Sequence, residues 1–405
     1  MSGVEIKLAD LCEVITKGTT PSNIGAEFTE DGIKYIRSEM LTSSKYITED
    51  GFLYISEDTH NKLKRSQLKA GDILFSMAGV YLGKTAILRE CDVPSNTNQA
   101  VALIRVIPEK CNREFVYYYL NLPEVVKSVN SITGQAAQPN INLKQIGSIP
   151  ILLPSREIQD QIVLLVSTYD DLIENNQKQI KLLEEAAQQL YKEWFVNLRF
   201  PGHETTPISD GIPEGWKKYK FSEIASIMSG GTPKTDVKEY YDGDIPFYTP
   251  KDSNGAFFAF DTITHISKSG LDHCNSQYYP SGTVIITARG TVGKTTILAV
   301  PMAMNQSCYA LKCDELNSPY YLFFSLNKEV AALKTMANGG VFNTIIVKTF
   351  DSIHLTMPTH EVLAAFDAAI SPIMDQIKVK MQQNECLAEA RDRLLPKLMN
   401  GEIEV

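Results

Sequence analysis

Residues 157–200 read EIQDQIVLLVSTYDDLIENNQKQIKLLEEAAQQLYKEWFVNLRF and contain neither glycine nor proline. Their apolar residues recur mostly at steps of three and four, which is the spacing of one face of a helix. This stripe consists of Ile158, Ile162, Leu165, Tyr169, Leu172, Ile180, Leu183, Leu190 and Trp194. The pattern predicts one long helix with a coiled-coil-like seam, which Pro201 and Gly202 would bring to an end.

A second stretch of the same character begins at Glu361 and closes the chain. Its apolar stripe consists of Val362, Phe366, Ile370, Ile373, Ile377, Leu387, Leu394 and Leu398. Position 158 matches position 362 and position 194 matches position 398, so one offset of 204 residues relates the two stripes. We expect this second long helix to end at Asn400 and Gly401, a helix-stop pair.

The segments that precede the two helices also repeat. GDILFSMAGVYLGKTAIL from Gly71 matches GTVIITARGTVGKTTIL from Gly282, and VPSNTNQAVAL from Val93 matches VPMAMNQSCYAL from Val300. The chain is therefore two copies of one module, which suggests a pseudo-twofold molecule. The expected divisions are a globular segment 1–155, a long helix 156–200, a second globular segment 201–357 and a second long helix 358–405.

The globular segments predict mixed structure, so the expected fold class is α+β, with two globular α/β units alternating with two long helices. Residues 73–76 and 85–88 are strand-like and are flanked by glycines. Residues 112–122 are rich in tyrosine and phenylalanine and predict a short helix packed on the sheet.

Composition describes an ordinary soluble protein of 405 residues, 43% hydrophobic and 21% charged. No apolar run is long enough to span a bilayer, and MSGVEIKLAD lacks the features of a signal peptide, so a cytoplasmic location is expected. The seven cysteines form no CxxC pair and the six histidines have no spaced metal partners. Reduced thiols and no metal site are therefore expected.

The net charge of −9 argues naively against a nucleic-acid partner. Two thirds of the excess negative charge, however, lies on the two helical segments, and each globular segment is nearly neutral. Composition therefore neither excludes nor requires a basic face on either globular segment. The densest basic cluster is formed by Lys62, Lys64, Arg65 and Lys69.

Two segments fit a relaxed phosphate-loop pattern, AGVYLGKT at residues 78–85 and ARGTVGKT at residues 288–295. A genuine phosphate loop must open a helix, because the phosphates sit on the helix N-terminal amides. Here each GKT is followed only by a short strand-like run before Pro94 or Pro301. The sequence therefore predicts strand, glycine turn and strand, with Lys84 and Lys294 exposed at the tips.

Other catalytic patterns are missing from the sequence. It has neither the Asn- or Asp-Pro-Pro-aromatic loop of an adenine methyltransferase nor the Pro-Asp dipeptide of a restriction-type nuclease. No serine, histidine and aspartate set is spaced persuasively. We expect no catalytic residue in this chain.

Several segments, spread over the whole chain, resemble the sequences of the DNA sequence-specificity subunits of type I restriction-modification systems. They are GQAAQPNINLKQIGSIPILLPSREIQDQIV (134–163), YKEWFVNLRFPG (191–202), IPEGW (212–216) and LLPKLMNGEI (394–403). The repeated strand with GKT turn and the pairs Asn98-Gln99 and Asn305-Gln306 are also similar to that family. The second copy of the first of these segments, GGVFNTIIVKTF, lacks its glutamine- and asparagine-rich composition.

The resemblance implies a noncatalytic subunit in which segments 1–155 and 201–357 are target-recognition domains and the two helices pair as an antiparallel coiled coil. Such a subunit reads a bipartite, asymmetric double-stranded DNA target. It directs adenine-N6 methylation or ATP-dependent cleavage by two methyltransferase subunits and two restriction/translocase subunits. S-adenosylmethionine, ATP and Mg are used by those partners, and no cofactor is expected in this chain.

Reading DNA requires cations and amides on phosphates and bidentate side chains on base edges. Loop-like polar positions near the repeated segments are the candidates for these contacts. They are Arg37, Lys45, Lys64, Arg65, Lys84, Gln135, Gln138 and Asn140 in the first segment, and Lys251, Asn254, Arg289, Lys294, Asn338 and Asn343 in the second.

Two other readings stay open at the level of sequence. The chain could be a noncatalytic coiled-coil scaffold that binds only proteins, a reading favoured by its acidic, apolar-striped helices. It could also be the recognition half of another, type II-like restriction-methylation enzyme. Sequence-dependent, salt-sensitive DNA binding in the presence of a methyltransferase partner would distinguish a reader from a scaffold.

Overall fold

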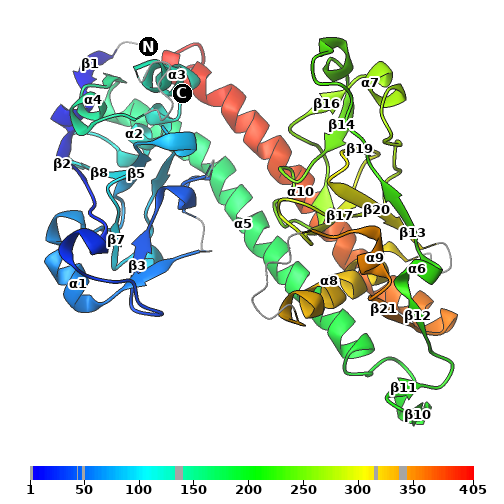
Figure 1. The fold of residues 1–405 in the computed structure, drawn as a ribbon. Helices are drawn as coiled ribbons and strands as arrows, with labels where there is room; N and C mark the ends of the chain where they lie inside the picture. The colour runs from blue at the N-terminus through cyan, green and yellow to red at the C-terminus, as the bar shows by residue number, and fades with distance from the viewer. Residues whose placement is uncertain (1–2, 43, 48–50, 133–139, 314–317, 337–343) are drawn as a thin grey trace. The chain divides into compact units, whose positions relative to one another are not determined.

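The computed structural model describes residues 3–42, 44–47, 51–132, 140–313, 318–336 and 344–405. The chain forms two compact units, which we call unit 1 (Met1–Asn175 with Asn384–Val405) and unit 2 (Asn176–Gln383). The two long helices, α5 (Arg156–Phe195) and α10 (His360–Asn400), each contribute one part to each unit (Figure 1). None of the helices in the described ranges is both long and apolar enough to cross a membrane.

Unit 1 is built on an antiparallel sheet in the order β2 (Cys12–Lys17), β8 (Val101–Val106), β5 (Ile73–Ser76) and β6 (Thr85–Ile87). A second sheet has the order β4 (Leu53–Ile55), β3 (Ile33–Ile36) and β7 (Ser95–Thr97), with β3 and β7 parallel. A ladder pairs β1 (Val4–Lys7) with β9 (Pro150–Leu153). The helices of the globular part are α1 (Glu57–Lys62), α2 (Arg113–Leu120), α3 (Pro123–Ile132) and α4 (Leu143–Gly147).

Unit 2 has a sheet in the order β13 (Ser226–Ser229), β20 (Cys308–Lys312), β17 (Val284–Thr287), β18 (Thr295–Leu298) and β15 (Phe258–Ala259). Its second sheet has the order β16 (His265–Ile266), β14 (Ile245–Tyr248) and β19 (Ala303–Met304). The two-stranded ladders are β10 (Ile208–Ser209) with β11 (Ile212–Pro213), and β12 (Lys217–Lys220) with β21 (His354–Met357). The helices are α6 (Phe221–Ile224), α7 (Lys268–Asp272), α8 (Pro319–Met336) and α9 (Val347–Phe350).

The internal repeat is confirmed by strand order. The order β2-β8-β5-β6 of unit 1 recurs as β13-β20-β17-β18 in unit 2, and the parallel pair β3 and β7 recurs as β14 and β19. The expected strands at residues 73–76 and 85–88 are β5 and β6, and the expected helix at residues 112–122 is α2 with Asn112 as its N-cap. The α+β class is therefore confirmed.

The first long helix ends five residues earlier than its sequence predicts. After Phe195 the Asn197 N–H bonds back to the Lys192 carbonyl at 2.9 Å, and Leu198 adopts a left-handed φ of 57°. The chain thus leaves the helix before it reaches Pro201. Helix α10 continues through Pro372 and ends at Asn400, where Gly401 has a φ of 79°, as predicted.

The two long helices pair antiparallel. In unit 1, Ile162 and Val166 of α5 share a core with Leu395 and Leu398 near the end of α10. In unit 2, the Phe195 ring near the end of α5 lies 4.8 Å from the ring of Phe366, near the start of α10. The beginning of each helix therefore meets the end of the other, as the resemblance implies.

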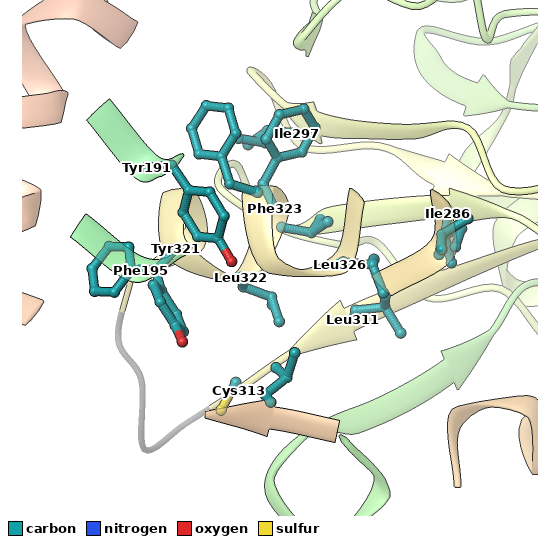
Figure 2. Close-up of a cluster of buried hydrophobic side chains, with 14 of the residues drawn as sticks. Tyr191, Phe195, Ile286, Ile297, Leu311, Cys313, Tyr321, Leu322, Phe323 and Leu326 are labelled. Carbon is teal, nitrogen blue, oxygen red and sulfur yellow. The ribbon is translucent and has the colours of Figure 1, made fainter. Parts of the chain in front are cut away.

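The core of unit 2 is aromatic where the helices meet the globular part. Figure 2 shows side chains of α5, α8 and the central sheet gathered in this core. The Tyr191 ring stacks on Phe324 with centroids 5.6 Å apart, and its hydroxyl donates to Ser325 Oγ at 3.0 Å. The buried hydroxyl is thereby satisfied, so this tyrosine contributes apolar area without a desolvation penalty.

Unit 1 instead places a charged network at the corresponding junction. Asp170 of α5, only 4% exposed in its side chain, accepts a hydrogen bond from Arg391 of α10 at 2.5 Å. The Tyr118 hydroxyl donates to the same carboxylate at 2.6 Å. Close by, Lys45 donates to Glu114 at 2.8 Å and lies over the Tyr118 ring.

This network has an apolar counterpart in unit 2. The 204-residue offset places Met374 at the position of Asp170 and Ala187 at that of Arg391, and both are buried in the aromatic core. Lys45 corresponds to Phe257, because the Ile87 N–H bonds to the Lys45 carbonyl and the equivalent Ile297 N–H bonds to the Phe257 carbonyl. The junction between the long helices and the globular part is thus charged in unit 1 and apolar in unit 2.

Glu184, on the unit 2 part of α5, makes stability depend on pH. Burial raises the pKa of its carboxyl from the ordinary 4.5 to about 7. Because the pKa of the Glu184 carboxyl is higher in the folded protein than in the unfolded chain, proton binding at Glu184 favours the folded state. This favourable contribution to stability is complete below pH 4.5 and is lost as pH rises through about 7. We expect Glu184→Gln to increase the free energy of unfolding at pH 8 by about 1–2 kcal/mol and to change it little at pH 4.5.

Urea denaturation of the parent and Glu184→Gln at both pH values measures this effect. Glu185→Gln, at the exposed neighbouring position, is the matched control. A Glu184→Gln benefit of the same size at both pH values would contradict the titration.

Candidate nucleic-acid interface

A cleft of about 490 Å³, lined by both polar and apolar side chains, lies in unit 1 where β2 and β5 end and β8 begins. The backbone assembles it, because the Met77 N–H donates to the Ala100 carbonyl at 2.8 Å and the Ile141 N–H to the Met77 carbonyl at 2.9 Å. Its lining residues are Lys17, Met77, Ala78, Gln99, Ala100, Asn140, Ile141, Asn142, Leu143 and Lys144. The cleft therefore joins four separate segments, three of which supply side-chain amides or cations.

At the rim of this cleft the Thr20 hydroxyl donates to the side-chain carbonyl oxygen of Gln99. The two segments come close because of Gly18, whose N–H bonds to the Asn98 carbonyl at 3.0 Å. A Cβ at Gly18 would lie 1.8 Å from the Thr97 oxygen, so only glycine fits. The adjacent Asn98 shapes the turn, since its side-chain oxygen accepts the Ala100 N–H at 3.0 Å.

Basic side chains surround the Thr20–Gln99 pair. Lys17 and Lys144 are exposed in the lining of the cleft. Arg65 is exposed and donates to the hydroxyl of Thr19 at 3.3 Å, which places it beside the same pair. An exposed amide among three cations is suited to binding an anionic, hydrogen-bonding polymer such as a nucleic acid.

Unit 2 contains the same arrangement. The Thr232 hydroxyl donates to the side-chain oxygen of Gln306, and the Asn305 side-chain oxygen accepts the Ser307 N–H at 3.0 Å. Gly230 permits the close approach here, because a Cβ would lie 2.3 Å from the Asn305 oxygen. The repeat therefore preserves the hydrogen bond together with the glycine that makes it possible.

The neighbours of the Thr232–Gln306 pair supply basic groups from other positions. Arg289 is exposed in the turn after β17, and the Thr291 hydroxyl in that turn donates to the Pro250 carbonyl at 3.3 Å. This contact brings the exposed Lys251 beside the turn. Lys348 of α9 is exposed at the place that Lys144 of α4 occupies in unit 1.

Three residues of unit 1 that the sequence predicts as DNA contacts do not lie as exposed cations at the cleft. Lys45 is only 4% exposed and pairs with Glu114, so its prediction as a DNA contact is wrong. Burial alone would lower the pKa of the Lys45 ammonium, but Glu114 raises it above its ordinary value. Arg37 pairs with Glu39 at 3.3 Å, and among the described residues no contact places it at the cleft. Lys84 is half-buried rather than exposed at a tip.

The remaining predicted positions are distributed as follows. Lys64 is exposed beside Arg65, Asn140 is exposed in the cleft, and Lys294 is exposed in its turn. Asn254 is exposed, and its side-chain oxygen accepts the Ala256 N–H at 3.0 Å. Four predicted residues lie outside the described residues, namely Gln135, Gln138, Asn338 and Asn343.

Neither GKT segment is a phosphate loop. Strands β5 and β6 pair antiparallel across the first turn, and β17 and β18 pair antiparallel across the second. Each lysine therefore leads into a strand and not a helix, which confirms the strand, turn and strand prediction. In unit 2 the turn packs on α8, where burial and the charge of Lys294 lower the pKa of Lys334.

Thr20, Gln99, Thr232, Gln306, Lys17, Lys144 and Lys348 were not among the predicted contacts. A signal for the first four was present, since GTTP and GGTP align as Asn98-Gln99 and Asn305-Gln306 do. The repeat could have flagged them, but only the fold joins residues 79 positions apart in one hydrogen bond. The lysines carried no sequence signal of their own.

Comparison with known proteins identifies the family of the chain. Residues 1–185 and 213–385 match the type I restriction modification DNA specificity domain. The chain belongs to the type I restriction-modification specificity family. The chain is 25% identical over 406 residues to the type I restriction enzyme HindI specificity subunit of Haemophilus influenzae. The alignment covers 84% of this chain and 88% of the relative.

Two further specificity subunits are similar over nearly the whole chain. The MjaIX specificity subunit of Methanocaldococcus jannaschii is 24% identical over 411 residues, covering 98% of this chain and 93% of the relative. The crystal structure of the type I restriction-modification S subunit from M. genitalium superposes with a TM-score of 0.55 at 13% identity, covering 98% and 95% of the two chains. The structural likeness supports the two-module fold of the family.

Proposed function

We propose that this specificity subunit reads a bipartite, asymmetric target in double-stranded DNA, with one half-site read by each unit. The observation that carries the proposal is the threonine–glutamine pair, which lies at the same sheet edge in both units. Each pair is accompanied by exposed basic side chains, Lys17, Arg65 and Lys144 in unit 1 and Lys251, Arg289 and Lys348 in unit 2. Cations and amides set the register on phosphates, while bidentate side chains such as arginine can reach base edges.

We further propose that the subunit itself is noncatalytic and works through two methyltransferase subunits and two restriction/translocase subunits in the cytoplasm. The partners would carry S-adenosylmethionine, ATP and Mg, methylate adenine at N6 and cleave DNA with ATP. A contact face for another protein is supported by α5 in unit 1, where Leu164, Leu165 and Leu172 are 72%, 40% and 47% exposed. Apolar side chains left exposed along one helix are typical of a protein-binding surface.

The proposal is tested by exchanging residues 201–357 for the matching segment of a relative with another target. Methylome sequencing of a host carrying the hybrid is expected to show one half of the split motif changed and the other retained. The reciprocal exchange of residues 1–155 is the matched control and should change the opposite half. Change in both halves would contradict independent reading by the two units.

A gel-shift series with the methyltransferase subunit present separates a reader from a scaffold. A reader binds its target with affinity that falls steeply as salt rises, because phosphate contacts release counterions. Equal binding to target and unrelated duplexes at every salt concentration would favour the scaffold.

A further inference from the structure

We infer a division of labour within each site, which rests on the proposed function. Polar groups that occupy the same place in both units hold the sugar-phosphate backbone, and positions that differ between the units read the bases. The shared groups are the Thr20–Gln99 pair with Lys144, and the Thr232–Gln306 pair with Lys348. Among the differing positions, Arg289 is the base-reading residue of unit 2.

The correspondence of positions follows from backbone hydrogen bonds. Met77 and Ala288 are equivalent, since the Met77 N–H bonds to the Ala100 carbonyl and the Ala288 N–H to the Ser307 carbonyl at 2.7 Å. Ile141 and Ile345 in turn donate to the carbonyls of that same pair, both at 2.9 Å. Counting three residues onward from these isoleucines makes Lys144 equivalent to Lys348.

Residues that are identical in the two units cannot distinguish two unequal half-sites. The common feature of both half-sites is the sugar-phosphate backbone, which presents acceptor oxygens at every step. Because the threonine hydroxyl donates to the glutamine carbonyl oxygen, the glutamine retains two N–H donors that bond to nothing else within the described ranges. A clamped donor with a lysine beside it matches a phosphate group, which carries negative charge and presents only acceptor oxygens.

The differing positions lie at the same edge. Ala78 follows Met77 in unit 1 where Arg289 follows Ala288 in unit 2, and the exposed Asn140 precedes Ile141 where Thr344 precedes Ile345. Lys17 corresponds to Ser229, since they pair with the equivalent Ala102 and Tyr309. Arginine binds guanine O6 and N7 in bidentate fashion, so the half-site of unit 2 is expected to contain a guanine read by Arg289.

The test uses the full chain in complex with its methyltransferase subunit. Gln99→Ala and Gln306→Ala are each expected to weaken binding about three- to tenfold on every duplex, with the methylated motif unchanged. Thr20→Val, which releases Gln99, should reproduce part of that loss. Arg289→Ala is expected to reduce discrimination about ten- to hundredfold at one base pair, in one half-site only.

Gln177→Ala, at an exposed position of α5, is the matched control and should leave affinity and motif unchanged. Unchanged thermal unfolding of each variant excludes a folding defect. A changed base preference in Gln99→Ala, or no loss of binding in either glutamine variant, overturns the division. A uniform loss on all duplexes in Arg289→Ala overturns it as well, whereas failure of the parent complex to recognise any split motif refutes the proposed function itself.

Discussion

Arg391→Met is expected to lower the free energy of unfolding of unit 1 by about 3–5 kcal/mol. The change leaves the Asp170 carboxylate, 4% exposed, without its cation and, among the described residues, with the Tyr118 hydroxyl as its remaining hydrogen-bond donor. An uncompensated buried charge costs far more than a surface ion pair contributes. Urea denaturation followed by a signal from unit 1 measures the loss, and Arg393→Met is the control, because Arg393 is 78% exposed and pairs with the exposed Glu389.

The charge, and not the lost volume, is expected to cause that instability. Tyr118 corresponds to Phe324, because Asn121 and Asn327, three residues onward, bond to the equivalent Thr85 and Thr295. Tyr118→Phe, Asp170→Met and Arg391→Ala together therefore give unit 1 the residues that unit 2 has in Phe324, Met374 and Ala187. Replacing a whole buried ionic set by packed apolar groups is often neutral or stabilising, so this triple variant should recover most of the loss. A triple variant as unstable as Arg391→Met would show that packing is responsible.

Gly18→Ala should abolish methylation of the target while leaving most of the fold intact. The added Cβ would lie 1.8 Å from the Thr97 oxygen, so the turn that carries Gln99 must move. We expect overpacking to cost about 1–3 kcal/mol of stability and affinity for the target to fall at least tenfold. Gel shift and methylation assays of the complex measure the effect.

Gly230→Ala makes the equivalent change in unit 2, where the Cβ would lie 2.3 Å from the Asn305 oxygen. Each variant should lose contact with its own half-site alone, which footprinting on the target resolves. Ser22→Ala, exposed in the same loop as Thr20, is the control and should bind normally. Normal binding by Gly18→Ala would place the turn away from the DNA.

Local patterns predicted the regular elements well. The stripes of Ile158 to Trp194 and Val362 to Leu398 indicated two long helices, because burial against one partner imposes helical spacing. The glycine turns likewise indicated β5 to β6 and β17 to β18. The end of α5 could not be predicted, since the left-handed Leu198 leaves no mark that sequence alone reveals.

Site residues were harder to predict because their environment is set by distant contacts. Lys45 has the appearance of a loop cation, yet Glu114, 69 positions away, draws it into the interior. Gln99 gains its role from Thr20, 79 positions earlier, through a close approach that depends on Gly18. Polar loop composition thus indicated loop positions in each unit but not which of their side chains face solvent.

The contrast between the two junctions matters for a chain made of near-duplicates. During folding, either globular segment could dock on the helix ends meant for the other, because both present the same strand order. Cross-docking would keep the Asp170–Arg391 and Lys45–Glu114 pairs but would set them against apolar groups and take the Tyr118 hydroxyl away from the Asp170 carboxylate. A buried charged acceptor that loses its hydrogen-bond donor costs about 1–3 kcal/mol or more. The ionic network of unit 1 and the aromatic core of unit 2 therefore disfavour docking of either globular segment on the helix ends that belong to the other.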